Sequence, residues 1–354
     1  MNFFIVNATA LDTSGALSIL KQFLAEIPIT NNQWIIFVNS KIQLTENKEY
    51  IHLIPINNGK SLIKRFLWDT FGLKNWLKEN KIRPLASLSL QNTGFRTGYK
   101  IPNFIYYHQS IPFFQQKWSL LKKEQRALWF YKNIYPFFVK LFLNNKTEIF
   151  VQLNYIREQF INKFHIQSNK VHVISPNIKV SDKKNISQIE LPSNRINIFY
   201  PSTSFFYKNH FIIIEAIKQI NSIKLSLYIT VNKNEINSNC NFIHFMGKIP
   251  YTDVLSMYAS ADVLVFPSYI ETFGMPLLEA AAMGMPILVA DLPYAREVLR
   301  DYEGAVFINY NQPEAWRKEL IKIKKGTRYM PYKPAFKNSW PDLFKIIEDK
   351  IQII

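Results

Sequence analysis

Two glutamates stand eight positions apart in the segment PSYIETFGMPLLEAAAMGMPILVA, residues 267–290. The run DVLVFPS (262–268) is typical of a buried strand, and PLLEAAAM predicts a helix that begins a few residues later. Glu271 therefore falls on the connecting loop and Glu279 in the early helix. In open parallel sheets such loops lie at the carboxyl edge of the strands, where ligands bind. Both carboxylates can thus face one binding pocket.

The turn between the two glutamates has residues that suit such a loop. Gly274 can adopt a positive φ angle, and Pro276 fits the first turn of a helix, where its missing N–H costs nothing. An alternative without a binding site stays open for Glu279. A helix dipole stabilises an early acidic residue by about 0.3–1 kcal/mol, so this side chain could simply be exposed to solvent.

The whole segment resembles the E-x7-E motif of family 4 glycosyltransferases, which have the two-domain GT-B fold. Eight residues have the order and spacing of that motif: Glu271, Phe273, Gly274, Pro276, Glu279, Ala280, Gly284 and Pro286. YAREVL (294–299) follows at the expected distance, and residues 245–268 resemble the segment that leads into the motif. The resemblance is strong in the C-terminal half of the chain and weak in the N-terminal half.

This resemblance implies transfer of a sugar from a nucleotide-diphosphate sugar to a hydroxyl of a glycan or lipid-linked acceptor, with retention of the anomeric configuration. It indicates bacterial polysaccharide or lipopolysaccharide biosynthesis. Glu271 would lie near the transferred sugar, where a carboxylate stabilises an oxocarbenium-like state, and Glu279 would bond to the ribose of the donor. Thr272, Phe273 and Gly274 would contact the donor from the loop.

A departing diphosphate needs positive charge, and Lys208 is the candidate to supply it. This lysine lies in INIFYPSTSFFYKNHFIIIEAI (196–217), after a predicted strand and before a helical pattern, which is a position that faces phosphates. The segment resembles the donor-phosphate loop of the family, whose lysine matches Lys208. Many members carry an arginine about five residues earlier, where this chain has Ser202 and Thr203. Hydroxyl groups such as that of Thr203, backbone donors or another cation must substitute for the arginine. The alternative is that Lys208 is an ordinary surface lysine.

The sequence contains no Asp-x-Asp pair of the kind that holds a divalent metal against a diphosphate. The histidines show no metal-ligand spacing. We therefore expect metal-independent transfer without a cofactor. The resemblance to the family further implies that the departing diphosphate itself can take the proton of the acceptor.

Two residues of the N-terminal half are further candidates. Gly15 in LDTSGALSIL (11–20) stands at a predicted helix start, where the backbone can approach a phosphate or an acceptor closely, and we count it with the donor-binding residues. His108 ends the apolar strand in FIYYHQSIPFF (104–114) and resembles a sugar-contacting histidine of the family, so we count it with Glu271 and Lys208 as catalytic. A structural histidine at a strand end is the alternative.

The elements that position these residues alternate between short apolar runs and helical patterns, which predicts parallel sheets built from βαβ units. Ten strands are predicted, at residues 3–8, 34–39, 50–55, 85–90, 104–109, 196–202, 225–231, 242–247, 262–268 and 286–291. The fold class is therefore α/β, with two Rossmann-like domains facing across a cleft. By the resemblance, a C-terminal helix crosses back to the first domain.

The polar, aperiodic segment 176–195 reads as a linker between domains. It separates an acceptor domain, residues 1–175, from a nucleotide-sugar donor domain, residues 196–337, and residues 338–354 form the crossing helix. A length of 354 residues with 48% apolar residues agrees with two domains.

Composition also bears on the compartment. The single cysteine, Cys240, excludes an internal disulfide and a cysteine-based zinc site and favours a cytoplasmic protein. The start MNFFIVNATALD lacks the basic region of a signal peptide, and no run reaches the roughly 18 apolar residues of a membrane span. We expect a cytoplasmic protein that is soluble or peripheral on the inner face of the membrane.

The net charge of +17 is concentrated in residues 60–146, which carry an excess of +13 and should attract phosphates. Within this region, 61–82 and 118–140 combine lysines and arginines with tryptophan, phenylalanine and leucine. Basic amphipathic helices of this kind suit an anionic bilayer surface, which would fit a lipid-linked acceptor. Ordinary helices that pack their aromatic residues on the N-terminal sheet are an equal alternative.

Two rival functions stay open. A basic region with interleaved aromatic residues can bind nucleic acid, but we find no recognisable module and expect none to be bound. A GT-B protein that binds sugar nucleotides without turnover is compatible with the missing arginine.

Overall fold

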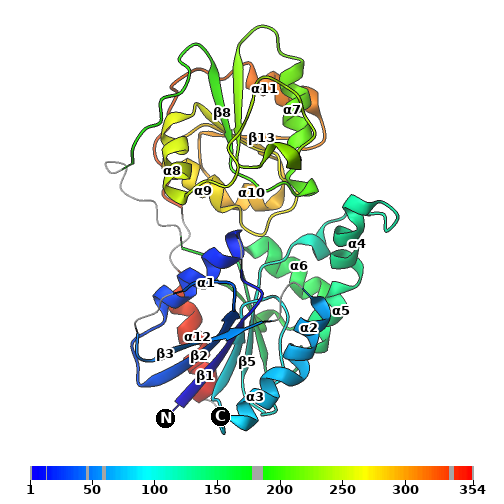
Figure 1. The fold of residues 1–354 in the computed structure, drawn as a ribbon, viewed down its shortest axis with the longest axis vertical. Helices are drawn as coiled ribbons and strands as arrows, with labels where there is room; N and C mark the ends of the chain where they lie inside the picture. The colour runs from blue at the N-terminus through cyan, green and yellow to red at the C-terminus, as the bar shows by residue number, and fades with distance from the viewer. Residues whose placement is uncertain are drawn as a thin grey trace. The chain divides into compact units, whose positions relative to one another are not determined.

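The computed structural model describes residues 2–12, 14–44, 48–57, 61–177, 186–334 and 339–352. The chain forms two compact units, each built on its own sheet (Figure 1). Unit 1 comprises Met1–Asn177 and Phe336–Ile354, and unit 2 comprises Ile178–Ala335. Of the predicted linker, residues 178–185 lie outside the described residues.

Unit 1 contains a seven-stranded parallel sheet with the order β3-β2-β1-β4-β5-β6-β7. Its strands are β1 Asn2–Ala8, β2 Asn32–Asn39, β3 Ile51–Ile56, β4 Ala86–Ser89, β5 Asn103–Tyr107, β6 Thr147–Val151 and β7 Val171–Val173. Its α-helices are α1 Ser14–Glu26, α2 Leu62–Leu67, α3 Leu73–Glu79, α4 Arg126–Asn133, α5 Tyr135–Leu141, α6 Asn154–Phe164 and α12 Trp340–Gln352. One π-helical turn, Trp68–Gly72, joins α2 to α3. The central strands are buried along most of their length because helices cover both faces of the sheet.

Helix α12 returns to unit 1 and packs beside α1, as Figure 1 shows in red and blue. Trp340 of α12 is fully buried and stacks on Tyr106 of β5, with ring centroids 5.3 Å apart. Lys350 Nζ lies 2.6 Å from Glu148 Oε1 on β6. The prediction of a helix that crosses back to the first domain is therefore confirmed.

Helix α3 covers the opposite face of the sheet. Leu73 and Leu77 are buried against Phe37 of β2. Trp68 and Trp76 contact the same ring edge-on, with centroid distances of 5.3 and 5.0 Å. The two tryptophans of segment 61–82 therefore pack on the sheet, as the alternative to a membrane helix predicts for them.

Unit 2 contains a six-stranded parallel sheet with the order β10-β9-β8-β11-β12-β13. Its strands are β8 Ile196–Tyr200, β9 Leu225–Ile229, β10 Ile243–Phe245, β11 Val263–Phe266, β12 Ile287–Ala290 and β13 Ala305–Ile308. Its α-helices are α7 His210–Lys218, α8 Tyr251–Ser260, α9 Met275–Ala282, α10 Pro293–Val298 and α11 Pro313–Leu320. Counted within each unit, the first six strands of both sheets have the same order, 3-2-1-4-5-6. This order makes the first and fourth strands neighbours, and ligands of doubly wound sheets bind outside the carboxyl ends of these strands.

All ten predicted strands are present, each displaced by a few residues at most. Three strands were missed: TEIFV (β6), VHV (β7) and AVFI (β13). Each has three to five residues and pairs at or near an edge of its sheet, so the sequence contains too little alternation to reveal it.

Candidate functional site

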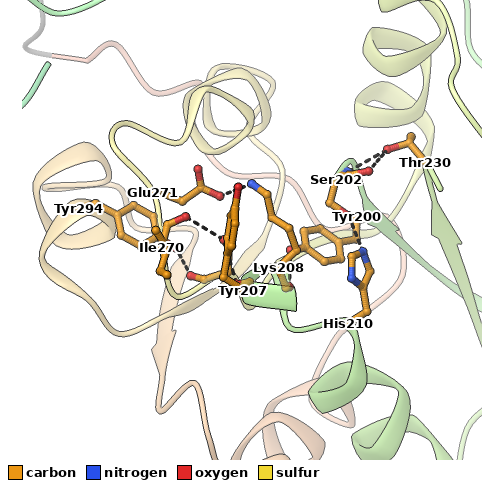
Figure 2. A network of polar contacts seen from close by, with 10 residues as sticks. Tyr200, Ser202, Tyr207, Lys208, His210, Thr230, Ile270, Glu271 and Tyr294 are labelled. Atoms are coloured by element: carbon orange, nitrogen blue, oxygen red, sulfur yellow. Dashed lines mark hydrogen bonds and ion pairs between the residues drawn. The ribbon is translucent and has the colours of Figure 1, made fainter. Parts of the chain in front are cut away.

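The candidate site of unit 2 lies where β8 and β11 end. These strands are neighbours in the sheet, so the loops that follow them meet at its carboxyl edge. Lys208 ends a short 3₁₀ turn, Phe206–Lys208, and its Nζ bonds to Glu271 Oε1 on the loop before α9 (Figure 2). The side chains of Lys208 and Glu271 are only 15% and 14% exposed. The structure therefore brings together two of the predicted catalytic residues, in a position that keeps some access to solvent.

The backbone around Lys208 is fixed by several hydrogen bonds. Tyr200 Oη donates to Lys208 O at 2.6 Å, and Tyr269 N donates to Tyr207 O at 3.0 Å. Lys208 Nζ also lies 5.6 Å from the ring centroid of Tyr207 and 5.7 Å from that of Phe266, which is within the range of cation–π attraction. These contacts hold the ammonium group in one place and so make it suitable for binding a diphosphate.

The place of the missing arginine is filled by a hydrogen-bonded network. Ser202 N donates to Thr230 Oγ1 at 2.8 Å, and Ser202 Oγ shares a hydrogen bond of 2.7 Å with His210 Nε2 (Figure 2). Burial and then the charge of Lys208 lower the pKa of His210 to about 4, so this ring is neutral at pH 7. His210 therefore does not replace the arginine charge. Thr203 Oγ1, a predicted donor contact, is buried and has no hydrogen-bond partner within the described chain.

Glu279 lies on α9 and is almost completely buried. Its carboxylate accepts two hydrogen bonds from α8: Tyr251 Oη lies 2.9 Å from Oε1, and Tyr258 Oη lies 3.0 Å from Oε2. Burial raises the pKa of Glu279, and the two tyrosine hydroxyls oppose that rise. The alternative of an exposed helix-dipole residue is therefore wrong. The sequence prediction missed both tyrosines, although their spacing of seven residues places them on one face of a helix.

The loop between the two glutamates has the predicted backbone. Gly274 has φ 84° and directly precedes α9, so the prediction of a positive φ angle is confirmed. Phe273 is buried, whereas Thr272 is half-buried on the loop. The loop thus presents Glu271 and Thr272 while Phe273 anchors it to the core.

Comparison with known proteins decides the family of this unit. Residues 181–333 match the family model described as glycosyl transferases group 1. Unit 2 belongs to the group 1 glycosyl transferases. The match contains Lys208, the E-x7-E segment and both tyrosines of α8.

One curated relative of this chain is named as a mannosyltransferase of the O-antigen chain. The chain is 24% identical over 202 residues to the O-antigen chain mannosyltransferase RfbU of Salmonella typhimurium, covering 54% of this chain and 55% of that protein. The chain thus spans about half the length of this curated relative.

Solved structures show the fold of both units. Sucrose-phosphate synthase of Thermosynechococcus elongatus matches with a TM-score of 0.70 at 14% identity. The match covers all of this chain and 94% of the synthase chain. WaaG, a glycosyltransferase of lipopolysaccharide biosynthesis, has a TM-score of 0.65 at 14% identity, covering 99% of both chains. The chain therefore has the GT-B fold, with two Rossmann-like domains.

The two candidates of the N-terminal half lie in unit 1 of this GT-B protein. Gly15 lies in the first turn of α1 and is exposed. His108 follows β5, and its Nε2 donates to Leu90 O at 2.9 Å while its backbone N donates to Asn92 Oδ1 at 2.6 Å. Burial lowers the pKa of His108. The ring is therefore neutral and held by a backbone carbonyl, and its catalytic role stays a prediction.

A buried polar cluster at the carboxyl ends of the central strands of unit 1 was not predicted. Asp69, on the π-helical turn, is only 4% exposed and accepts hydrogen bonds from Asn7 Nδ2 at 2.7 Å and Gln91 Nε2 at 3.0 Å. Burial raises the pKa of Asp69 to about 7, against the opposing charge of Arg65. This cluster lies at the carboxyl ends of β1 and β4, the strands that correspond to β8 and β11 of unit 2.

A metal-binding cluster and a membrane-spanning helix are both absent from the described residues. In that part of the chain, no three side chains of the types His, Cys, Asp and Glu are grouped so that they could hold a metal ion. None of the helices described above combines the length and apolarity needed to cross a bilayer.

Proposed function

We propose that this protein transfers a sugar from a nucleotide-diphosphate sugar to a hydroxyl of a glycan or lipid-linked acceptor, with retention of the anomeric configuration. The observation that carries the proposal is the fixed pair Lys208–Glu271 beyond β8 and β11, within a unit of the group 1 family. The O-antigen relative supports a bacterial surface polysaccharide or lipopolysaccharide as the product.

The chemistry of the pair suits this reaction. The donor diphosphate would compete with Glu271 for Lys208 Nζ, and the ammonium group would neutralise the charge that builds up as the glycosidic bond breaks. Glu271 would then be released to stabilise the positive charge on the transferred sugar. Thr203 Oγ1, which is buried without a hydrogen-bond partner within the described chain, would donate to the diphosphate once the side chain turns outward.

A panel of nucleotide sugars tests the proposal through thermal stability. A donor at 100 times its Kd stabilises the folded state by about 2.7 kcal/mol, even when the acceptor is unknown. We expect one nucleotide sugar to raise the melting temperature of the natural chain and to release its nucleoside diphosphate slowly in water. No stabilisation by any member of the panel would contradict the proposal. Stabilisation without release, with every acceptor extract tried, would favour a binding protein without turnover.

Metal independence and retention are parts of the same proposal. We expect that EDTA leaves transfer unchanged, because Lys208 takes the place of a divalent cation at the diphosphate. Loss of activity that Mg²⁺ or Mn²⁺ restores would contradict this mechanism. NMR of the first product would show the anomeric configuration of the donor, and the opposite anomer would exclude retention.

We also propose that unit 1 binds an anionic membrane surface, which would bring the enzyme to a lipid-linked acceptor on the inner leaflet. Large apolar side chains are exposed on α2, the π-helical turn and α5, including Ile63 at 73% and Phe137 at 65%. Helices α2 and α5 are in contact through Phe66 and Phe138, whose ring centroids are 5.7 Å apart. Exposed lysines lie on α2 and α5 (Lys64 and Lys140) and on α3, which directly follows the π-helical turn (Lys74 and Lys78). Such a combination of apolar and basic side chains suits an interface with anionic lipids.

Liposome cosedimentation tests the membrane surface. We expect that the double charge reversal Lys74→Glu and Lys78→Glu releases the protein from vesicles containing phosphatidylglycerol. The same change at Lys318 and Lys322, two lysines of unit 2, is the control and should leave binding intact. A natural chain that never binds these vesicles would contradict the proposal. Salt-sensitive binding of single-stranded oligonucleotides instead would favour the nucleic-acid rival.

A further inference from the structure

The two hydroxyl groups that bond to Glu279 differ in how firmly they are held. Tyr258 is fully buried in the middle of α8, and its ring packs edge-on against Phe199 with a centroid distance of 5.4 Å. Tyr251 is the first residue of α8 and is 50% exposed. Both hydroxyls nevertheless bond to the same carboxylate, at 2.9 and 3.0 Å.

We propose that Tyr251 is a placeholder for the ribose of the donor: a ribose hydroxyl replaces the Tyr251 hydroxyl on Glu279 Oε1, while Tyr258 stays bonded to Oε2. This inference rests on the proposed function, in which Glu279 binds the ribose. It adds that the site contains its own competitor for that contact, and that Tyr251 sets how strongly the site selects ribose.

The burial of Glu279 explains why a placeholder is useful. A buried carboxylate without hydrogen-bond donors is strongly destabilised, so Glu279 must accept hydrogen bonds before the nucleotide sugar binds. Tyr251 supplies that bond to Oε1, and its position at the start of α8 lets its side chain rotate toward solvent without opening the core. The exchange keeps two hydroxyl donors on Glu279 throughout.

The exchange also has a consequence for specificity. When a ribose hydroxyl replaces the Tyr251 hydroxyl, Glu279 loses one hydrogen bond and gains another, so the net gain in affinity is small. A deoxyribose leaves the Tyr251 hydroxyl bonded to Glu279, so the deoxy nucleotide binds only slightly more weakly than the ribose form. The natural chain should therefore distinguish ribose from deoxyribose only weakly. Without the Tyr251 hydroxyl, the ribose hydroxyl fills an empty place and the discrimination should increase.

Calorimetric titration of the full chain tests this inference. The probes are UDP, GDP and ADP, each with its 2′-deoxy and 3′-deoxy analogues. For the nucleotide that binds, the measured quantity is the ratio of the affinity of the ribose form to that of each deoxy analogue. For one of the analogues we expect this ratio to be about tenfold larger in Tyr251→Phe than in the natural chain, because the ribose hydroxyl then adds one hydrogen bond to Glu279. Tyr258→Phe should weaken binding of the ribose form, because it loses the bond that orients Glu279.

A matched control and the contrary results keep the test decisive. Tyr332→Phe removes a hydroxyl that bonds to Arg300 O at 2.6 Å rather than to Glu279, and should leave both affinities unchanged. An unaltered ratio of ribose to deoxyribose affinities in Tyr251→Phe would overturn the placeholder while leaving the proposed function standing. A weaker binding of the ribose form in that variant would instead make Tyr251 a direct contact and also overturn it. No binding of any of the three nucleotides to the natural chain would contradict the proposed function and this inference together.

Discussion

The carboxyl edges of the two sheets have corresponding positions in the fold but contain different electrostatic arrangements. In unit 1, beyond β1 and β4, the Asp69 carboxyl is bonded by the amides of Asn7 and Gln91. In unit 2, beyond β8 and β11, the Glu271 carboxyl is paired with the ammonium group of Lys208. The first carboxyl is sealed in the core, whereas the second pair keeps partial exposure.

This difference shows that the place beyond the carboxyl ends of the first and fourth strands is not by itself a binding site. Burial raises the pKa of Asp69 to about 7, because the charge of Arg65 and the hydrogen bonds of the two neutral amides only partly offset the desolvation of the carboxyl. Glu271 instead has the ammonium group of Lys208 directly beside it, and both side chains are partly exposed, so a charged ligand can exchange with either of them. Partner charge and access, rather than position in the sheet, therefore distinguish the candidate active site from the buried cluster.

The largest expected effect comes from removing the cation of unit 2. Lys208→Ala should reduce the rate of transfer by roughly 10²–10³-fold, because a preorganised charge that stabilises the departing diphosphate is lost. Initial rates at saturating donor and acceptor measure this change. The melting temperature should move by only a few degrees, since the network of Ser202, Thr230 and His210 stays in place.

The control for that variant is another lysine of the same unit. Lys218 is paired with Glu215 on the exposed side of α7, at 2.7 Å, and Lys218→Ala should transfer sugar at the natural rate. Equal rates for the natural chain and the Lys208 variant would remove Lys208 from the site and make the two sheet edges alike in function.

A smaller effect, on stability, is expected from the carboxyl of unit 1. The pKa of Asp69 is raised in the folded state, so the folded chain holds a proton that the unfolded chain has released. The free energy of unfolding should therefore fall by about 2–3 kcal/mol as the pH rises from 5 to 8. Urea denaturation across this range measures the slope.

The variant Asp69→Asn isolates this contribution from that of the histidines. Asparagine cannot ionise, so the slope between pH 5 and 8 should become flatter than that of the natural chain. Identical slopes for the two proteins would mean that Asp69 is ionised throughout, and the contrast between the sheet edges would then rest on access alone.

The smallest effect is expected in the network that stands in place of the missing arginine. Ser202→Ala leaves His210 Nε2 without its partner and should lower the free energy of unfolding by about 1–2 kcal/mol. Ser204→Ala, which removes an exposed bond to Glu235, should have a smaller effect than that. Thermal denaturation of both variants ranks them, and the reverse order would show that the network does not stabilise the loop.

Much of the site follows from local sequence. The strand DVLVFPS, the glycine with positive φ and the lysine after β8 each depend on neighbours within a few residues, so their patterns were sufficient. The cluster of Asp69 and Asn7 depends on a contact between residues 62 positions apart, and no periodicity reports such a contact. Tyr251 and Tyr258 were missed for a similar reason. Their spacing shows a shared helix face, but only the packing of α8 against α9 shows that this face meets a carboxylate.

Helix α12 has a consequence for how the chain is made. Unit 1 lacks Trp340, Leu343 and Phe344 of its core until residues 340–352 have been synthesised, after the whole of unit 2. Unit 2 is continuous in sequence and can therefore complete its folding on the ribosome first, which reverses the usual N-terminal-first order. During that interval the N-terminal sheet exposes the apolar face that α12 later covers, so nascent chains of this protein should be a substrate for chaperones.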